Sequence, residues 1–351
     1  LAVQVNGKLR DRVMVPEADF LIAASICSAI SPDGKLVAHA EMQDGKQRLI
    51  VTNAVTFGTD VVLPPDDVQY FGLTFSLDSN YLYFTRMEKN NAGVRDRSGT
   101  LYRLPLQGAL PVKLKERVDS PVTFSPEGAL FAFVRYNYET NESSVIISDI
   151  AATAERTLAT RQGRNRFSEF GLAWSPNGRS IVCPASRWDT GKSFRIDLYA
   201  IDVNTGNEQT IGNRSWASIY QVAWQPDMSG LIISARERFM AQHQLWRVAY
   251  PSGDIQKLTN DLTEYYSVSV AGEKIVSVKT DWQWRMWRLT LDGSSAPAAL
   301  VTGSGEISGV VWTARDKIVY AAMAQDRLNL SRIDPDTGEI LATLNQVEAL
   351  A

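Results

Sequence analysis

The chain has 351 residues, of which 44% are hydrophobic and 21% are charged, and this composition excludes a disordered or fibrous protein. Its 36 basic and 39 acidic residues give a net charge of −3 without any cluster of lysine or arginine, so we expect no nucleic-acid partner. No apolar run approaches the ~18 residues of a membrane span, and we expect no direct insertion into a membrane.

The first predicted element is a hairpin in residues 1–23, where "LAVQVNGKLRDRVMV" forms two short strands around an Asn-Gly turn. Five related phrases follow: "SPDGKLVAHAE", "SLDSNYLYFTR", "SPEGALFAFVR", "SPNGRSIVCPA" and "QPDMSGLIISAR". They begin 45 to 50 residues apart, at Ser31, Ser76, Ser125, Ser175 and Gln225, which is the period of propeller blades or solenoids. Alternating apolar residues on both sides of each polar turn predict a β-hairpin rather than helices.

Each unit continues with two further strands around a second polar turn, as in "DLYAIDVNTGNEQTI" and "QLWRVAYPSGDIQKL". Four antiparallel strands per unit indicate an all-β fold, a β-propeller that fills the whole chain as a single domain. Two weaker copies bring the prediction to seven blades, with eight or six as alternatives. The N-terminal strands either close the ring against the last blade, as the outer half of a blade, or belong to a natural protein longer than this chain. The blades are expected to start near Ala24, Tyr70, Ser120, Phe170, Ile219, Tyr265 and Ile307.

Catalytic and metal-binding patterns are weak. Cys27 and Cys183 lie in apolar strand-like runs, which predicts buried thiols, and His39 and His243 are expected in separate blades as unrelated structural residues. The turn "DPDTGE" at residues 334–339 lacks the full spacing of a calcium loop. The chain has no G-x-S-x-G pentapeptide and no kinase motif. We therefore expect no enzymatic activity, no cofactor and no metal.

The most informative candidates are aromatic and arginine side chains in loops that we expect on one face of the propeller, opposite the Ser-Pro-Asp-Gly turns. Such side chains dominate binding hot spots, although an aromatic residue just before an inner strand also packs between blades. Trp174, Trp224, Trp246, Trp287 and Trp312 occupy strand positions and are expected in the core between blades. The candidate binding residues are Tyr70, Phe71, Arg86, Arg135, Arg187, Trp188, Trp216, Tyr220, Arg236, Tyr265, Tyr266, Trp282 and Trp284.

Several of the motifs resemble a known family. "AWSPNGRSIV", "SPDGKLVAHA" and "QLWRVAYPSGDIQKLTND" resemble the TolB-like, WD-type repeat propellers of bacteria, over nearly the whole chain. At finer grain, "VLPPDDVQYFGLTFS" and "GTLYRLPLQGALPVKL" resemble the propeller region attached to serine/threonine kinases or winged-helix regulators of acidobacteria. The resemblance implies a sensor or protein-binding module, covalently linked to a kinase or regulator domain in the full-length protein, and a periplasmic or extracytoplasmic location, with a cytoplasmic one not contradicted.

Together these observations predict a non-catalytic module that binds a protein segment or small ligand through its aromatic and arginine face, as part of a larger bacterial signalling or envelope system. Two alternatives remain open. One is a stand-alone propeller enzyme, a lyase or hydrolase that acts on carbohydrate or peptide with carboxylates and arginines of the central tunnel. The other is a passive spacer.

Overall fold

The structure is a computed structural model that describes residues 2–5, 8–12, 27–88, 98–188, 194–239, 241–261, 263–280, 283–288, 296, 298–304, 307–313, 317–324 and 327–347. All regular elements in these residues are β-strands, which confirms the expected all-β fold of four-stranded antiparallel sheets. Within the same ranges there is no helix that could cross a membrane.

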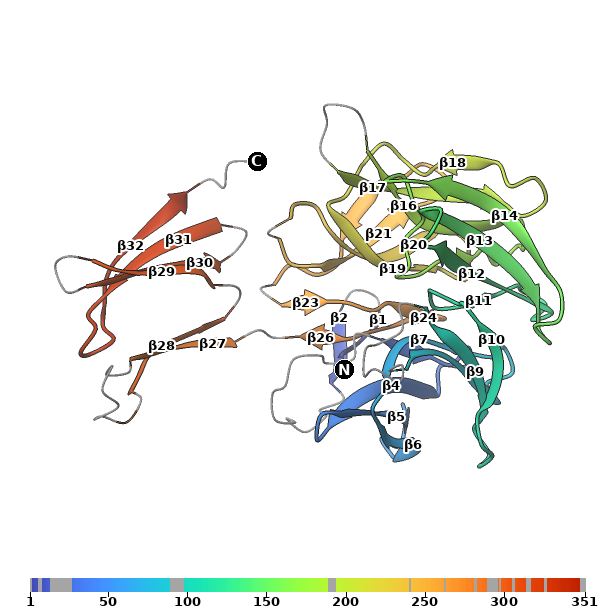
Figure 1. Cartoon of the computed structure of the whole chain (residues 1–351), viewed down its shortest axis with the longest axis horizontal. Coiled ribbons are helices and arrows are strands. Elements are labelled where there is room, and N and C mark those ends of the chain that lie inside the picture. Colours follow the sequence, from blue (N-terminus) through green and yellow to red (C-terminus); the bar gives the residue numbers. More distant parts are fainter. Residues whose placement is uncertain are drawn as a thin grey trace.

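Five four-stranded sheets follow one another along the chain and stand side by side as blades (Figure 1). In each, four consecutive strands pair with their chain neighbours, as the two hairpins per repeat predict. The strands are β3 (Ser28–Ile30), β4 (Leu36–Gln43), β5 (Lys46–Asn53), β6 (Thr59–Asp66), β7 (Gln69–Phe75), β8 (Tyr81–Met87), β9 (Thr100–Pro105), β10 (Val112–Glu116), β11 (Thr123–Phe124), β12 (Leu130–Asn137), β13 (Glu142–Asp149), β14 (Glu155–Gln162), β15 (Ala173–Trp174), β16 (Ser180–Arg187), β17 (Arg195–Asp202), β18 (Glu208–Thr210), β19 (Ser218–Trp224), β20 (Gly230–Arg236), β21 (Gln244–Ala249) and β22 (Ile255–Lys257).

The repeated phrase forms the turn between the first two strands of a blade. Ser31 Oγ donates a hydrogen bond to Asp33 Oδ1 at 2.6 Å, and the Leu36 N–H donates to Ser31 Oγ at 2.9 Å. Gly34 has φ of 70°, a conformation that glycine adopts without a steric penalty. The Ser, Asp and Gly of the phrase are therefore explained by turn chemistry alone.

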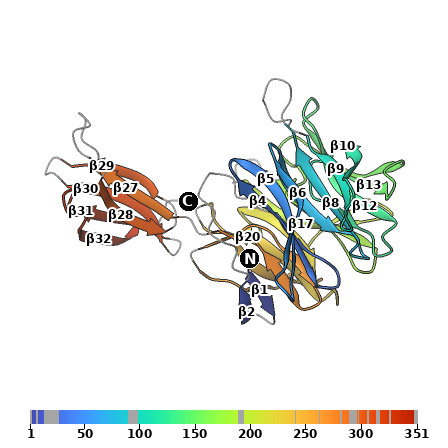
Figure 2. The same cartoon turned by 90° about the horizontal axis from the view of Figure 1, so that it is seen from below.

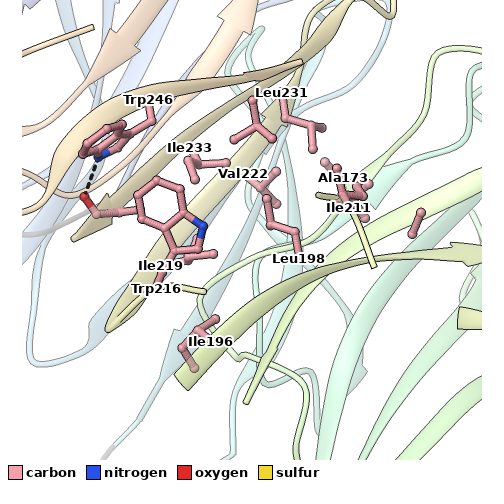
Figure 3. Close-up of a cluster of buried hydrophobic side chains, with 14 of the residues drawn as sticks. Ala173, Ile196, Leu198, Ile211, Trp216, Ile219, Val222, Leu231, Ile233 and Trp246 are labelled. Atoms are coloured by element: carbon pink, nitrogen blue, oxygen red, sulfur yellow. Dashed lines mark hydrogen bonds between the residues drawn. The ribbon is translucent and has the colours of Figure 1, made fainter. Parts of the chain in front are cut away.

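Aromatic side chains hold neighbouring blades together. Trp216 and Trp246 meet edge to face with their ring centroids 5.0 Å apart, and Trp246 Nε1 donates to the Ala235 carbonyl at 3.0 Å (Figure 3). Trp224 Nε1 donates at 3.1 Å to the Ala173 carbonyl of the preceding blade. The expected core positions of Trp174, Trp224 and Trp246 are thereby confirmed, and Cys27 and Cys183 are buried free thiols as predicted.

The sixth four-stranded sheet combines the two ends of the ring. β1 (Ala2–Val5) and β2 (Lys8–Arg12) pair beside β24 (Ser269–Ala271) and β25 (Lys274–Ser277), in the order β2-β1-β25-β24. β23 (Glu264–Tyr265) and β26 (Lys279–Thr280) prolong the β24–β25 hairpin. In this arrangement the N-terminal strands form the outer half of the sixth sheet, and a pairing with the last repeat, which the sequence left open, stays a prediction.

The C-terminal strands lie apart from the other sheets in both views (Figures 1 and 2). They form a two-stranded and a four-stranded sheet that share a small core around Met286 and Tyr320. Trp287 and Trp312 are 48% and 54% exposed, so their expected burial between blades is wrong here, because no neighbouring sheet in the described part of the chain covers them. A seven-bladed ring stays a prediction. The strands are β27 (Gln283–Arg288), β28 (Ala298–Ser304), β29 (Ile307–Trp312), β30 (Ile318–Ala324), β31 (Arg327–Ile333) and β32 (Ile340–Val347).

Candidate functional site

Three aromatic rings from three consecutive blades gather beside a histidine on the loop face of the propeller, and two of them contact its ring. We call Phe170, Tyr220, Tyr266 and His243 the aromatic cluster. The Tyr220 ring centroid lies 4.5 Å from Phe170, 5.0 Å from Tyr266 and 4.6 Å from His243. These residues stand where the chain enters an inner strand, or in the loop between the second and third strands. Those connections share one face because consecutive strands are antiparallel.

A half-buried carboxylate orients the histidine. Glu264 Oε2 accepts hydrogen bonds from the His243 backbone N–H at 2.8 Å and from its ring Nδ1 at 2.9 Å. The proton is therefore assigned to Nδ1, which leaves Nε2 as an acceptor. Among the described residues, the buried Nε2 has no hydrogen-bond partner. A buried acceptor without a partner is destabilising by about 1–3 kcal/mol, so the cluster holds a polar atom whose hydrogen-bonding capacity is unused.

The surroundings of the cluster combine burial with positive charge. Burial lowers the pKa of His243, and Glu264 opposes this shift while the nearby Arg236 guanidinium adds to it. Burial also raises the pKa of Tyr220, so its hydroxyl stays protonated at neutral pH. Phe170 is 39% exposed at the rim. The cluster therefore exposes the Phe170 ring to solvent and places the Tyr220 hydroxyl, the Arg236 guanidinium and the His243 imidazole near it.

Comparison with known proteins identifies the fold. No protein-family model and no curated protein matches the chain. Among solved structures, a putative TolB from Agrobacterium tumefaciens superposes with a TM-score of 0.51 at 18% sequence identity, over 66% of this chain and 79% of that one. The fold is that of a TolB-like β-propeller.

Two further structures resemble the chain less closely in superposition. TolB from Acinetobacter baumannii gives a TM-score of 0.44 at 14% identity, over 89% of this chain and 79% of that one. The β-propeller domain of a trilobed protease from Pyrococcus furiosus gives 0.46 at 12% identity, over 91% and 97% of the two chains. At such low identity the comparisons bear on fold alone, and the attachment of a kinase or regulator domain stays a prediction.

Four of the thirteen candidate residues pack inside the TolB-like propeller. Tyr70, Trp216 and Tyr265 are buried between blades, and Tyr70 meets Phe84 edge to face at 5.5 Å. Phe71 packs against Gly99 so closely that a Cβ at Gly99 would lie 2.3 Å from the Phe71 ring. These side chains therefore serve the packing of the blades, the alternative that the sequence left open for aromatic residues beside an inner strand.

Three arginine candidates are engaged in ion pairs on the blade rims. Arg86 pairs with Glu88 at 2.8 Å, Arg135 with Glu155 at 2.6 Å, and Arg187 with Asp197 at 3.0 Å. The Arg135 guanidinium lowers the pKa of Glu155 to about 2. Charges already paired in this way offer less to a ligand than Arg236, whose buried Nε has no partner among the described residues.

The remaining candidates divide between the cluster and other regions. Tyr220 and Tyr266 belong to the aromatic cluster, beside Arg236. Trp188 lies elsewhere, 40% exposed, with the Arg164 guanidinium 4.5 Å from its ring centroid. Trp282 lies outside the described residues, and the structure describes the backbone of Trp284 within β27 but not its side chain. The thirteen candidates thus form several small groups rather than one continuous surface.

Sequence reasoning missed His243 and Glu264 as partners of the cluster. The available signal was position, since His243 stands directly before the third strand of its blade, on the same face as Tyr220. Among the residues that the structure describes, no three His, Cys, Asp or Glu side chains are grouped so as to hold a metal ion. Asp334 instead accepts hydrogen bonds from backbone N–H groups of its own turn and forms an ion pair with Lys317.

The two buried histidines predict how stability depends on pH. Burial lowers the pKa of both His39 and His243 below the usual value of 6.5. Below about pH 6.5 the unfolded chain therefore binds protons that the folded chain does not, and the free energy of unfolding falls as the pH drops from about 7.5 to about 5.5. Urea unfolding across this range measures the slope. In a His39→Gln/His243→Gln variant, the free energy of unfolding should depend less steeply on pH. A wild-type chain whose free energy of unfolding does not fall over this pH range contradicts the expectation.

Proposed function

We propose that the chain is a non-catalytic binding module that recognises a protein segment at the aromatic cluster, as the sensing or scaffolding part of a larger bacterial signalling or envelope system. The observation that carries the proposal is the Nε2 of His243, which has no hydrogen-bond partner among the described residues and lies beside the rings of Tyr220 and Tyr266. A peptide supplies both things this arrangement lacks, namely an apolar side chain to cover the rings and an N–H donor.

Binding is favoured over catalysis by the surroundings of the histidine. An imidazole held by a carboxylate is the usual arrangement of a general base, but such a base needs a hydroxyl, thiol or water within reach. Within the described part of the chain, no hydroxyl or thiol side chain lies within hydrogen-bond distance of Nε2, and its neighbours are tyrosine rings. The His243–Glu264 pair therefore supports a role in positioning a donor group from a ligand.

We also propose a cellular location for the module and a domain to which it is linked. We infer a periplasmic or other extracytoplasmic location, and a kinase or regulator domain linked to the propeller in the full-length protein. These parts rest on the resemblance of the repeats to TolB-like propellers. They are independent of the aromatic cluster, so the binding experiment below does not depend on them.

Replacing Tyr220 with alanine tests the site. Peptides selected from a random display library against the wild-type chain are expected to lose about 30-fold in affinity for Tyr220→Ala, because a hot-spot side chain contributes about 2 kcal/mol or more. Isothermal titration calorimetry measures the affinity. Phe57→Ala is the matched control, since Phe57 is 47% exposed in a turn on the opposite face and its loss should leave binding unchanged.

Two results would contradict the proposal. One is an affinity that Tyr220→Ala leaves unchanged while Phe57→Ala lowers it. The other is a library without any binder, combined with stabilisation of the chain by a small molecule in a thermal-shift screen, which would favour a small ligand over a protein segment.

A further inference from the structure

β27 carries the sequence pattern of a third blade strand but does not lie in a blade of the ring. Its "RMWRL" matches "QLWRV" in β21, with Trp287 at the position of Trp246. Trp246 is 5% exposed and packs toward the preceding blade, whereas Trp287 is 48% exposed. An exposed tryptophan at a position that is buried in another repeat indicates an apolar surface that packs against a further element of the fold.

The other face of β27 already makes the contacts of a third strand with the following blade. Leu245 of β21 packs with Tyr265 and Val268 of the next repeat, and Met286, one residue before Trp287, packs in the same way with Ile318 and Tyr320. The β27–β28 hairpin therefore meets the β29–β32 sheet as one blade meets its successor.

A close backbone approach supports the same relation for β28. A Cβ at Gly206 would lie 2.3 Å from the carbonyl oxygen of Leu158, which belongs to the fourth strand of the preceding blade. In the C-terminal part, a Cβ at Gly338 would lie 2.2 Å from the carbonyl oxygen of Leu300 in β28. β28 thus has the place of a fourth strand beside the β29–β32 sheet, and β27–β28 is the outer half of the blade before it.

In the sixth sheet, the positions of the third and fourth strands are occupied by the N-terminal hairpin, β1 and β2. β1 pairs with β25 so that Ala2 stands opposite Ser277 and Gln4 opposite Ile275. In the fifth blade Ile233 stands opposite Trp246. The same register in the sixth repeat would put Trp287 opposite Ser277, whose buried Oγ has no partner among the described residues. The N-terminal hairpin and β27 therefore fit the same edge of β25.

The inner strand of the β29–β32 sheet is uncovered as well. Trp312 ends "SGVVW" as Trp224 ends "YQVAW", yet Trp312 is 54% exposed and Trp224 only 7%. Val310 and Val311 beside it are also exposed. In the ring, the corresponding Val222 is buried and the corresponding Ala223 is half-buried against the next blade.

We propose that the N-terminal hairpin and the β27–β28 hairpin exchange at the edge of β25, and that when β27 occupies this edge the β29–β32 sheet closes the ring as a seventh blade. The β27–β32 unit moves as one body, because Met286 and the Arg288–Asp336 ion pair hold its two sheets together. Closure buries Trp287 and Trp312 and releases β1 and β2. In the sequence only two residues separate β26 from β27, a number that is typical of a hairpin loop.

Cysteine pairs in the full chain distinguish the two arrangements. Ser234 stands opposite Leu245 in the fifth blade, so closure brings Val278 opposite Met286, within disulfide reach. The matched pair for the arrangement in the structure is Gln4 with Ile275. After mild oxidation, mass spectrometry of the monomer band should find a disulfide in Val278→Cys/Met286→Cys. A disulfide that forms only in Gln4→Cys/Ile275→Cys, or a Val278→Cys/Met286→Cys disulfide found only in covalent dimers, overturns the proposal.

Iodide quenching of tryptophan fluorescence decides the case in which neither disulfide forms. In the closed ring both Trp287 and Trp312 are covered, so removing them in Trp287→Phe/Trp312→Phe leaves the quenching constant equal to or higher than that of the wild type. A clearly lower quenching constant in the variant means that both side chains are exposed in solution, and this result overturns closure. Both measurements leave the aromatic cluster untouched, so they are independent of the proposed binding function.

Discussion

Replacing Trp216 with alanine is expected to lower the free energy of unfolding by about 3–5 kcal/mol. Trp216 is among the largest fully buried side chains, and its ring packs on Trp246 and on a cluster that joins the fourth and fifth blades (Figure 3). Its backbone exchanges hydrogen bonds with Ile196 at 2.8 Å in both directions, and alanine keeps these. The loss therefore reports the side chain alone, and urea unfolding measures it.

Trp188→Ala is the control for this experiment. Trp188 is 40% exposed and contacts mainly Phe194 and the Arg164 guanidinium, so its removal should change the free energy of unfolding by less than about 1 kcal/mol. Equal losses for the two variants would contradict the assignment of Trp216 to the core between blades. This comparison also separates stability from binding, because both tryptophans are candidates for the binding surface on sequence grounds.

The second large effect is expected at Gly206, in the turn between the third and fourth strands of the fourth blade. Gly206 has φ of 73°, and a Cβ there would lie 2.3 Å from the Leu158 carbonyl oxygen of the neighbouring blade. Gly206→Ala must therefore both adopt a left-handed conformation and push two blades apart. We expect a loss of about 1–3 kcal/mol beyond the cost of the backbone conformation.

Gly45→Ala isolates the conformational part of that cost. Gly45 has φ of 76° in the turn between β4 and β5, with nothing within 4 Å of an added Cβ. Its substitution should cost only the ~1–2 kcal/mol of a left-handed alanine. Thermal and urea unfolding of the two variants give the difference. If Gly206→Ala is no more destabilising than Gly45→Ala, the close approach between these blades is absent in solution.

Much of the propeller could be predicted from the sequence because its signals are local. The Ser-Pro-Asp-Gly phrase forms its turn through hydrogen bonds among Ser31, Asp33 and Leu36, and the alternating apolar residues of the flanking strands face neighbouring blades. Both features are present within about ten residues. The burial of Trp224 and Trp246 follows from the same alternation.

The pairing that completes the sixth sheet could not be predicted in this way. The edge of β25 accepts any strand with a suitable length and alternation, and both β1 and β27 meet that requirement. The choice depends on contacts more than 260 residues apart, between Ala2 and Ser277 for example. Because β1 rather than β27 pairs with β25, Trp287 and Trp312 are exposed, although the corresponding tryptophans of the fifth blade are buried.

The aromatic cluster was predictable only in part. Tyr220 and Tyr266 stand out in the sequence as aromatic residues beside inner strands, but so do Tyr70 and Tyr265, which are buried. What separates the two groups is the direction of each side chain, which a bulge or a shift of one residue reverses. The pairing of His243 with Glu264 joins a loop to strand β23, 21 residues further along the chain, and no regular sequence spacing predicts it.

Hydrogen exchange of the chain with and without a library-selected peptide tests the proposed binding site most directly. We expect the bound peptide to slow exchange in the segments around Phe170, Tyr220, His243 and Tyr266, all on one face. Protection confined to the turns of the opposite face, such as residues 53–58 and 202–207, or to the exposed strand β29, would contradict it.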